Sequence, residues 1–89
     1  MATHKSAIKR HTQSEQRRVR NAAVRSRVRN AIKQVRQSIA ARERETAETR
    51  LRVAERLLFK AVTKGVLHKK TASRALSRLS HGVHTLRAA

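Results

Sequence analysis

The chain has 89 residues, which suffice for one domain with a thin hydrophobic core. Its 23 Lys and Arg against five acidic residues, all of them Glu, give a formal charge of +18, and so large a charge calls for a polyanionic partner. The lack of cysteine excludes disulfides and thiolate metal sites. The lack of a long apolar run and of an apolar leader predicts a cytoplasmic protein without a membrane span.

The first predicted element is a long basic helix. Residues 5–40 contain no glycine or proline and favour helix, but apolar residues gather on one face only from Val24 onward. Before Val24 the same face carries polar residues such as Asn21 and Arg17. Residues 5–22 therefore have no apolar surface to bury and are predicted to project as a basic arm of about 18 residues, with residues 23–88 forming the bundle. The apolar seam of this helix consists of Val24, Val28, Ala31, Ile32, Val35 and Ile39.

A break between Ala40 and Thr46 is predicted from the phase of the apolar residues. The next seam would point about 120° away from the first along one straight helix, so a single helix could not bury both seams against the same neighbour. Clustered glutamates agree with a helix N-terminus here, with Thr46 as a possible N-cap. No glycine or proline marks the turn, so one uninterrupted helix stays open as an alternative. This second seam consists of Ala47, Leu51, Ala54, Leu58, Ala61 and Val62.

The remaining elements are a second helix over about 47–64 and a third over about 69–88. Gly65 is predicted to end the second helix, with Val66 packing back on its last turn. The helical segments match in length at roughly 27–30 Å. We therefore predict an all-α, three-helix up-down-up bundle whose first helix is extended as a basic N-terminal arm. The third seam consists of Ala72, Ala75, Leu76, Leu79, Val83 and Leu86.

Two separated motifs resemble one known family. HKSAIKR at residues 4–10, followed by Gln16–Arg18, Asn21, Arg25–Ser26 and Arg29, is similar to the N-terminal helix of the bacterial family of small-subunit ribosomal protein twenty. KGVLHKKTASRALSRL at residues 64–79 resembles the second signature of that family. The family's usual Gly-containing link between the first two helices is ARERETA here.

The resemblance implies a structural constituent of the small ribosomal subunit. Such a protein binds small-subunit (16S) ribosomal RNA directly and early in assembly and supports the folding of that RNA. It requires few or no protein partners, no membrane and no small-molecule substrate, and it is located in the cytoplasm within the ribosome. It is not an enzyme.

Basic residues flank the apolar seam of the first helix on both sides and lie opposite the seam of the third. Arg and Lys neutralise phosphates and release counterions, and Arg can grip two phosphate oxygens. A merely solvated charged face is the alternative, but Glu15 is the single acid among the first forty residues and is expected to pair locally with Arg18. The predicted RNA-binding residues are Lys5, Lys9, Arg10, Arg17, Arg18, Arg20, Arg25, Arg27, Arg29 and Arg36, with a second contact through Lys70, Arg74 and Arg78.

The aromatic and histidine residues indicate how the chain can bind RNA and whether it can bind a metal. Phe59 is the only aromatic residue, so recognition is expected to rest on RNA shape, phosphates and 2′-hydroxyls rather than on base stacking. Phe59 lies off the second seam and is interpreted as packing at the edge of the core. His81 and His84 have the i, i+3 spacing of a metal pair, but without Cys or Asp and among many cations no metal or cofactor is predicted.

Three other classes of function are alternatives. A nucleoid-type DNA-compacting protein fits the charge equally well, and only the two motifs argue against it. An amphipathic helix on a membrane surface would need bulky apolar residues, whereas these seams are built from Ala, Val and Ile. Catalysis is disfavoured because the chain has no carboxylate pair suited to acid–base chemistry and no Gly-rich phosphate loop.

Overall fold

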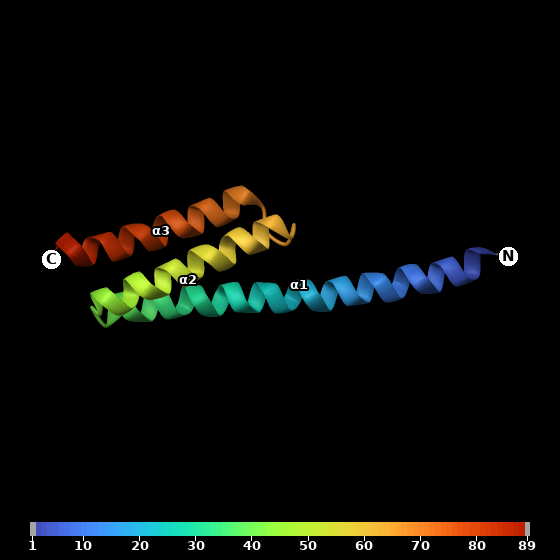
Figure 1. The fold of residues 1–89 in the computed structure, drawn as a ribbon, viewed down its shortest axis with the longest axis horizontal. Coiled ribbons are helices and arrows are strands. Elements are labelled where there is room, and N and C mark those ends of the chain that lie inside the picture. The colour runs from blue at the N-terminus through green and yellow to red at the C-terminus, as the bar shows by residue number, and fades with distance from the viewer. Residues whose placement is uncertain (1, 89) are drawn as a thin grey trace.

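The computed structural model describes residues 2–88, and the side chains of residues 5–86. Within this range the chain forms three helices, α1 (Ala2–Ala40), α2 (Arg44–Thr63) and α3 (Lys69–Ala88), and no strand. Helix α2 runs back along the C-terminal half of α1, and α3 reverses direction again beside α2 (Figure 1). The predicted all-α, up-down-up bundle is thus confirmed.

The core lies where the three predicted apolar seams meet. Near the base of the arm, Leu58 packs with Val24 and Val28 of α1. Further along, Leu79 packs with Val35. Small residues fill much of the interface, which lets the helix backbones approach closely and keeps the core thin. The buried apolar residues are Val24, Val28, Ala31, Val35, Ala47, Ala54, Leu58, Ala61, Val66, Ala72, Leu79 and Val83.

The predicted break between α1 and α2 is present, and it is built without glycine. Arg42 adopts the left-handed conformation with φ of +57°. Its N–H donates to the Ile39 carbonyl at 3.0 Å, and the Glu43 N–H donates to the Ser38 carbonyl at 3.0 Å. These two bonds form a Schellman motif, which satisfies carbonyls that the end of α1 would leave without partners.

The predicted start of α2 was wrong by three residues. The helix begins at Arg44 rather than near Ala47, and Thr46 lies inside its first turn instead of capping it. The residue at the N-cap position is Glu43, whose side chain makes no capping hydrogen bond. The Schellman motif explains the early start, because it reverses the chain within residues 41–43 and leaves Arg44 free to begin the next helix.

A second Schellman motif ends α2 as predicted. Gly65 has φ of +75°, its N–H donates to the Val62 carbonyl at 3.0 Å, and the Val66 N–H donates to the Ala61 carbonyl at 2.9 Å. The Val66 side chain is buried against Leu58 and its neighbours, which confirms that it packs back on the helix. Just before α3, His68 Nδ1 accepts a hydrogen bond from the Lys70 N–H at 3.1 Å.

A buried polar contact that the sequence analysis missed joins α1 to α2. Ser38 is 1% exposed. Arg50 Nη1 donates to the Ser38 Oγ at 2.8 Å and to the Gln34 carbonyl oxygen at 3.1 Å. The hydroxyl of Ser38 also donates to the Gln34 carbonyl at 3.1 Å. The contact satisfies the one buried polar side chain found in the described core.

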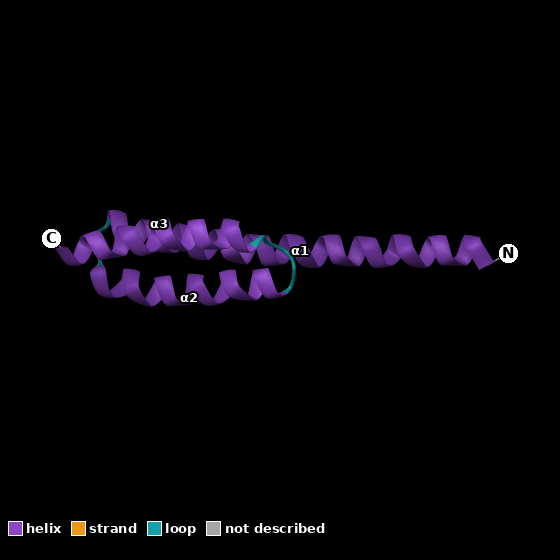
Figure 2. Cartoon of the chain, turned by 90° about the horizontal axis from the view of Figure 1, so that it is seen from above, coloured by secondary structure: helices purple, strands orange, loops and turns teal. Residues whose placement is uncertain are grey.

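The N-terminal half of α1 extends past the bundle. Figure 1 and Figure 2 show this half with no other helix beside it, while the C-terminal half is covered by α2 and α3. The molecule consequently measures 69 × 21 × 14 Å along its principal axes. We use the term arm for residues 5–22 of α1.

Candidate nucleic-acid interface

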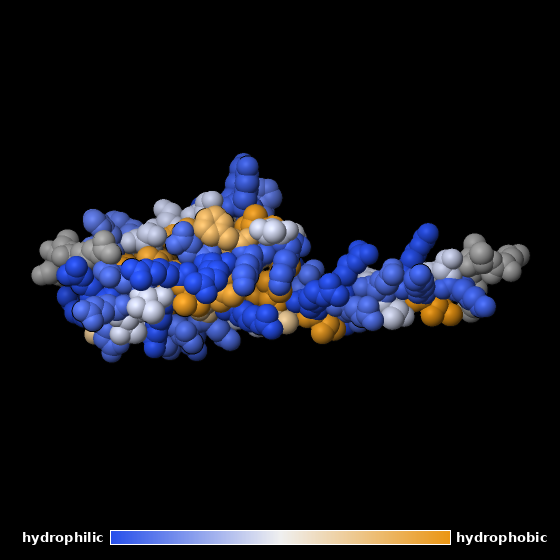
Figure 3. Space-filling model, in the orientation of Figure 1, coloured by the Kyte–Doolittle hydropathy of each residue, from blue (hydrophilic) through white to orange (hydrophobic). Residues whose placement is uncertain are grey.

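The arm presents its cations to solvent on several sides. Because no other element packs on it, all of its predicted RNA-binding side chains are exposed. Figure 3 shows the arm as a mostly hydrophilic surface with small, separate hydrophobic spots. The exposed large apolar residues of the arm are Ile8 and Val19. The exposed cations are Lys5, Lys9, Arg10, Arg17, Arg18 and Arg20.

One acid accompanies these cations. Arg18 Nη2 lies 2.7 Å from Glu15 Oε2, which confirms the predicted local ion pair. The Arg18 side chain is 76% exposed, and an ion pair in such a position is worth at most about 1 kcal/mol. A phosphate group can therefore compete for this guanidinium. Five glutamates cannot neutralise 23 cations, so the molecule as a whole needs external anions.

Where the arm joins the bundle, cations from two helices line one hollow, which we call the junction groove. Arg17 and Arg20 of α1 line it together with Lys64, the C-cap residue of α2, and its volume is about 520 Å³. Val24 and Val66 form its apolar part. Lys64 is not among the RNA-binding residues predicted from the sequence. The sequence signal for it was Gly65, which places the end of α2 at Lys64; the antiparallel course of α2 along α1 then returns this end to the base of the arm.

A second hollow, the α1–α3 groove, has a volume of about 220 Å³ and an almost entirely apolar lining. Arg25 and Arg29 edge it on the α1 side, and Thr71 and Ala75 on the α3 side. At 100° per residue, Arg18 and Arg36 continue the same flank of α1 in both directions. The flank that the sequence analysis predicted therefore borders this groove.

The predicted residues on α3 are exposed and turned away from the core. Lys70, Arg74 and Arg78 all lie on the outer side of the helix, and Arg74 Nε donates to the Lys70 carbonyl at 3.4 Å. Lys69 and Lys70 occupy the first turn, which contains no acid. Positive charge at a helix N-terminus is unfavourable to the helix dipole, so a bound anion would relieve this repulsion.

The predicted residues are spread along the molecule rather than gathered in one pocket. Arg20 lies in the junction groove, and the exposed Arg27 shares that flank of α1. Arg25 and Arg29 lie on the opposite flank, at the α1–α3 groove. An elongated cationic surface of this kind suits a polymer with repeated phosphates and not a small molecule.

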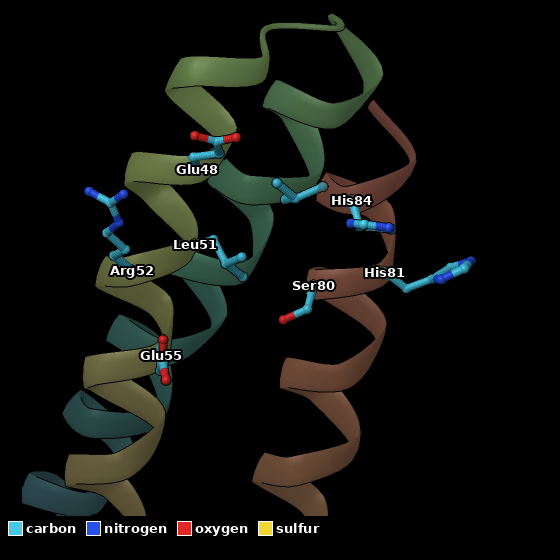
Figure 4. Close-up of a pocket in the computed structure, with 8 residues that line it drawn as sticks. Glu48, Leu51, Arg52, Glu55, Ser80, His81 and His84 are labelled. Atoms are coloured by element: carbon cyan, nitrogen blue, oxygen red, sulfur yellow. The ribbon is translucent and has the colours of Figure 1, made fainter. Parts of the chain in front are cut away.

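One face of the bundle has a different character. A groove of about 440 Å³ lies between α2 and α3, and Glu48 and Glu55 of α2 are part of its lining (Figure 4). His81 and His84 lie on α3, and His81 points away from α2. Carboxylates repel phosphate, so this acidic groove is not part of the candidate interface.

Metal binding and membrane insertion are the remaining alternatives. Among the residues that the structure describes, no three His, Cys, Asp or Glu side chains form a group that could hold a metal ion. None of the described helices combines the length and the apolar character needed to cross a bilayer.

Comparison with known proteins decides the family. The family model of ribosomal protein S20 matches residues 2–84. The chain belongs to the ribosomal protein S20 family. The resemblance seen in the two sequence motifs is therefore confirmed.

Full-length relatives agree with this membership. The chain is 52% identical to small ribosomal subunit protein bS20 of Oleidesulfovibrio alaskensis, covering 93% of this chain and 95% of the relative. It is 51% identical to bS20 of Solidesulfovibrio magneticus, covering both chains completely. For bS20 of Maridesulfovibrio salexigens the identity is 49%, over 97% of this chain and 99% of the relative. The S20 family is one of structural ribosomal proteins with a general role in ribosomal RNA binding, and it is not an enzyme family.

Proposed function

We propose that this S20 family member is a structural constituent of the small ribosomal subunit that binds 16S ribosomal RNA directly. It acts in the bacterial cytoplasm, within the ribosome, and supports the folding of the RNA during assembly. The observation that carries this proposal is the arm, a helix whose cations are exposed and which extends past the other two helices. Such a helix is stable and useful only where phosphates surround it.

The two parts of the chain have different tasks in this proposal. The bundle, residues 23–88, folds around its own core and holds α1 in a fixed direction. The arm, residues 5–22, then reaches along the RNA and places cations against the phosphates of neighbouring RNA segments. A protein that bridges segments in this way holds them together and so favours the folded RNA.

The junction groove and the α1–α3 groove are the two places where cations of the proposed RNA-binding surface gather. Arg17, Arg20 and Lys64 converge on the junction groove and suit a sugar–phosphate strand passing the base of the arm. Arg25 and Arg29 present a second pair of guanidinium groups at the α1–α3 groove. The proposed RNA-binding residues are the thirteen predicted from the sequence together with Lys64.

Recognition in this proposal rests on the shape and charge of the RNA backbone. No binding step requires a small molecule, a metal or a membrane, and few or no protein partners are needed. A-form RNA displays its phosphates and 2′-hydroxyls in an arrangement that differs from duplex DNA, so cations spaced along a helix can distinguish the two.

A competition experiment tests this proposal. The protein is bound to a 16S ribosomal RNA transcript and challenged with duplex DNA of equal length at fixed salt. We expect the RNA to be retained, and the triple variant Arg17→Gln, Arg20→Gln, Lys64→Gln to bind it at least ten-fold more weakly. The matched control replaces Arg44 and Arg52, two exposed cations on the acidic side of α2, and should bind nearly as well as the wild type. Equal competition by DNA would instead support the DNA-compacting alternative.

A further inference from the structure

Phe59, the single aromatic residue of the chain, is 61% exposed on the surface of α2. The interpretation that it packs at the edge of the core was therefore wrong. The apolar residues that precede and follow it along the seam, Leu58 and Val62, already supply the contacts of α2 with the core. The exposed ring therefore presents an apolar, aromatic face at the surface of α2 that a planar ligand can contact.

The ring stands beside a small hollow between α2 and α3, which we call the aromatic notch. Its volume is about 90 Å³, and its floor is apolar, with Val62 from α2 and Leu76 from α3. The polar side chains of its lining are those of Lys69 and Ser73, both from the first two turns of α3. In Figure 3 hydrophobic surface emerges where α2 and α3 lie side by side.

The charges around the aromatic notch favour an anionic occupant. Lys69 lines the notch, and Lys60 and Arg56 are exposed on α2 within one turn of Phe59. Glu55, one turn before Phe59, belongs to the neighbouring acidic groove, so the charge changes sign along this face and is positive at the Lys69 end. An apolar peptide side chain would fit the floor but would leave these cations without partners.

We propose that the aromatic notch binds one unpaired nucleotide of the ribosomal RNA. The base stacks on the ring of Phe59 beside the apolar floor and directs its polar edge toward α3. The Ser73 hydroxyl forms a hydrogen bond with the base edge, and the Lys69 ammonium binds the phosphate of the same nucleotide. This proposal rests on the proposed function, and it adds a contact to a flipped-out base to an interface otherwise made of backbone contacts.

Fluorescence can test the notch directly, because the chain contains no Trp and no Tyr. The variant Phe59→Trp keeps an aromatic ring in place and introduces a single indole. When a 16S ribosomal RNA transcript binds, we expect strong quenching of the indole emission, as stacking on a base produces. The matched control is Val53→Trp, which places the indole at another exposed position of α2 away from the notch, and its emission should stay nearly constant.

Affinity measurements complete the test. Phe59→Leu keeps an apolar side chain but removes the stacking face, so we expect it to bind the transcript about ten-fold more weakly, while Phe59→Trp binds as the wild type does. If the transcript binds and the emission of Phe59→Trp stays constant, the notch proposal is overturned and the proposed function stands. A blue shift that occurs only when other small-subunit proteins are added would also overturn it, in favour of a protein occupant. Loss of all RNA binding in the wild type would contradict the proposed function itself.

Discussion

At the scale of single residues, Arg42 carries an unusual backbone conformation. Residues other than Gly, Asn and Asp adopt its φ of +57° only at an energetic cost. The Schellman motif at the end of α1 holds the residue in this conformation. This strained conformation makes the tight reversal between α1 and α2 possible. Arg42 is exposed, so the position can be changed without disturbing the core.

We predict that Arg42→Gly raises the free energy of unfolding by about 1 kcal/mol, since glycine adopts this conformation without the steric cost of a Cβ. Urea denaturation followed by circular dichroism measures the change. Arg42→Ala is the matched control, because it removes the same charge but keeps the strain. Equal stabilities of the two variants would show that the left-handed turn is not maintained in solution.

The contact between Arg50 and Ser38 should contribute measurably to the free energy of unfolding. The Arg50 guanidinium is held by a buried hydroxyl and a carbonyl, and hydrogen bonds to charged groups contribute more than neutral ones. A double-mutant cycle with Arg50→Met and Ser38→Ala should give a coupling free energy of about 1 kcal/mol. The pair Arg52→Met and Ser38→Ala should show none, since Arg52 lines the acidic groove on another side of α2. Coupling of the same size in both cycles would argue against a specific contact.

At the scale of elements, the bundle is held together by a few large side chains among many alanines. Leu79 of α3 is 4% exposed and packs with Val35 of α1, and Leu58 of α2 is 3% exposed near the base of the arm. A protein with so thin a core loses much of its stability when one contact is removed, because the free energy of unfolding of small domains is only a few kcal/mol. Each large residue therefore matters for all three helices.

We predict that Leu79→Ala lowers the free energy of unfolding by about 3 kcal/mol, through lost burial and the cavity that remains. Thermal unfolding followed by circular dichroism measures this loss. Val53→Ala, at an exposed position of α2, is the control and should change stability by less than about 0.5 kcal/mol. Unchanged unfolding of Leu79→Ala would mean that α3 is not packed against α1 and α2 in solution.

The arm and the bundle should also differ in their dynamics. A helical segment of about 18 residues without tertiary contacts opens readily in water, whereas the middle of α2 is covered on one side by the core. We expect amide hydrogens of residues 5–22 to exchange fast in the free protein and slowly when a 16S ribosomal RNA transcript is bound. Amides of residues 51–62 should be protected in both states. An arm equally protected without RNA would show that a protein surface covers it.

At the scale of the whole molecule, charge dominates. The chain carries +18, and residues 2–40, which form α1, contain eleven Lys and Arg against the single Glu15. These cations are distributed over a body 69 Å long, so they can contact several RNA segments at once. Every phosphate contact releases counterions, which makes the affinity depend on salt.

We predict that the affinity for a 16S ribosomal RNA transcript falls roughly 10³-fold between 50 and 200 mM salt if about six cations reach phosphates. The variant with Arg17, Arg18 and Arg20 all replaced by Gln should reduce the slope of log K against log salt by about three. Filter binding over a salt series measures both slopes. A nearly flat dependence in the wild type would remove the electrostatic basis of the proposed interface.

The sequence alone determined the elements with long periodic patterns. The three apolar seams located the helices and their buried faces, because burial repeats with the helical period and leaves a direct trace in the order of residues. Gly65 marked the end of α2 for a similar reason, since its conformation is one that few other residues adopt. The cationic flanks and the arm followed from the same periodicity, and the two motifs led to the S20 family.

Only the tertiary structure decided the features that depend on which helices meet. The turn at Arg42 has no glycine, so its left-handed conformation and the start of α2 at Arg44 left no mark in the sequence. Lys64 joins the arm cations only because α2 runs back to the base of the arm. The exposure of Phe59 likewise depends on how α3 lies beside α2. Local periodicity fixes which face of a helix is apolar, but the neighbours of its remaining residues are set by the packing of whole helices.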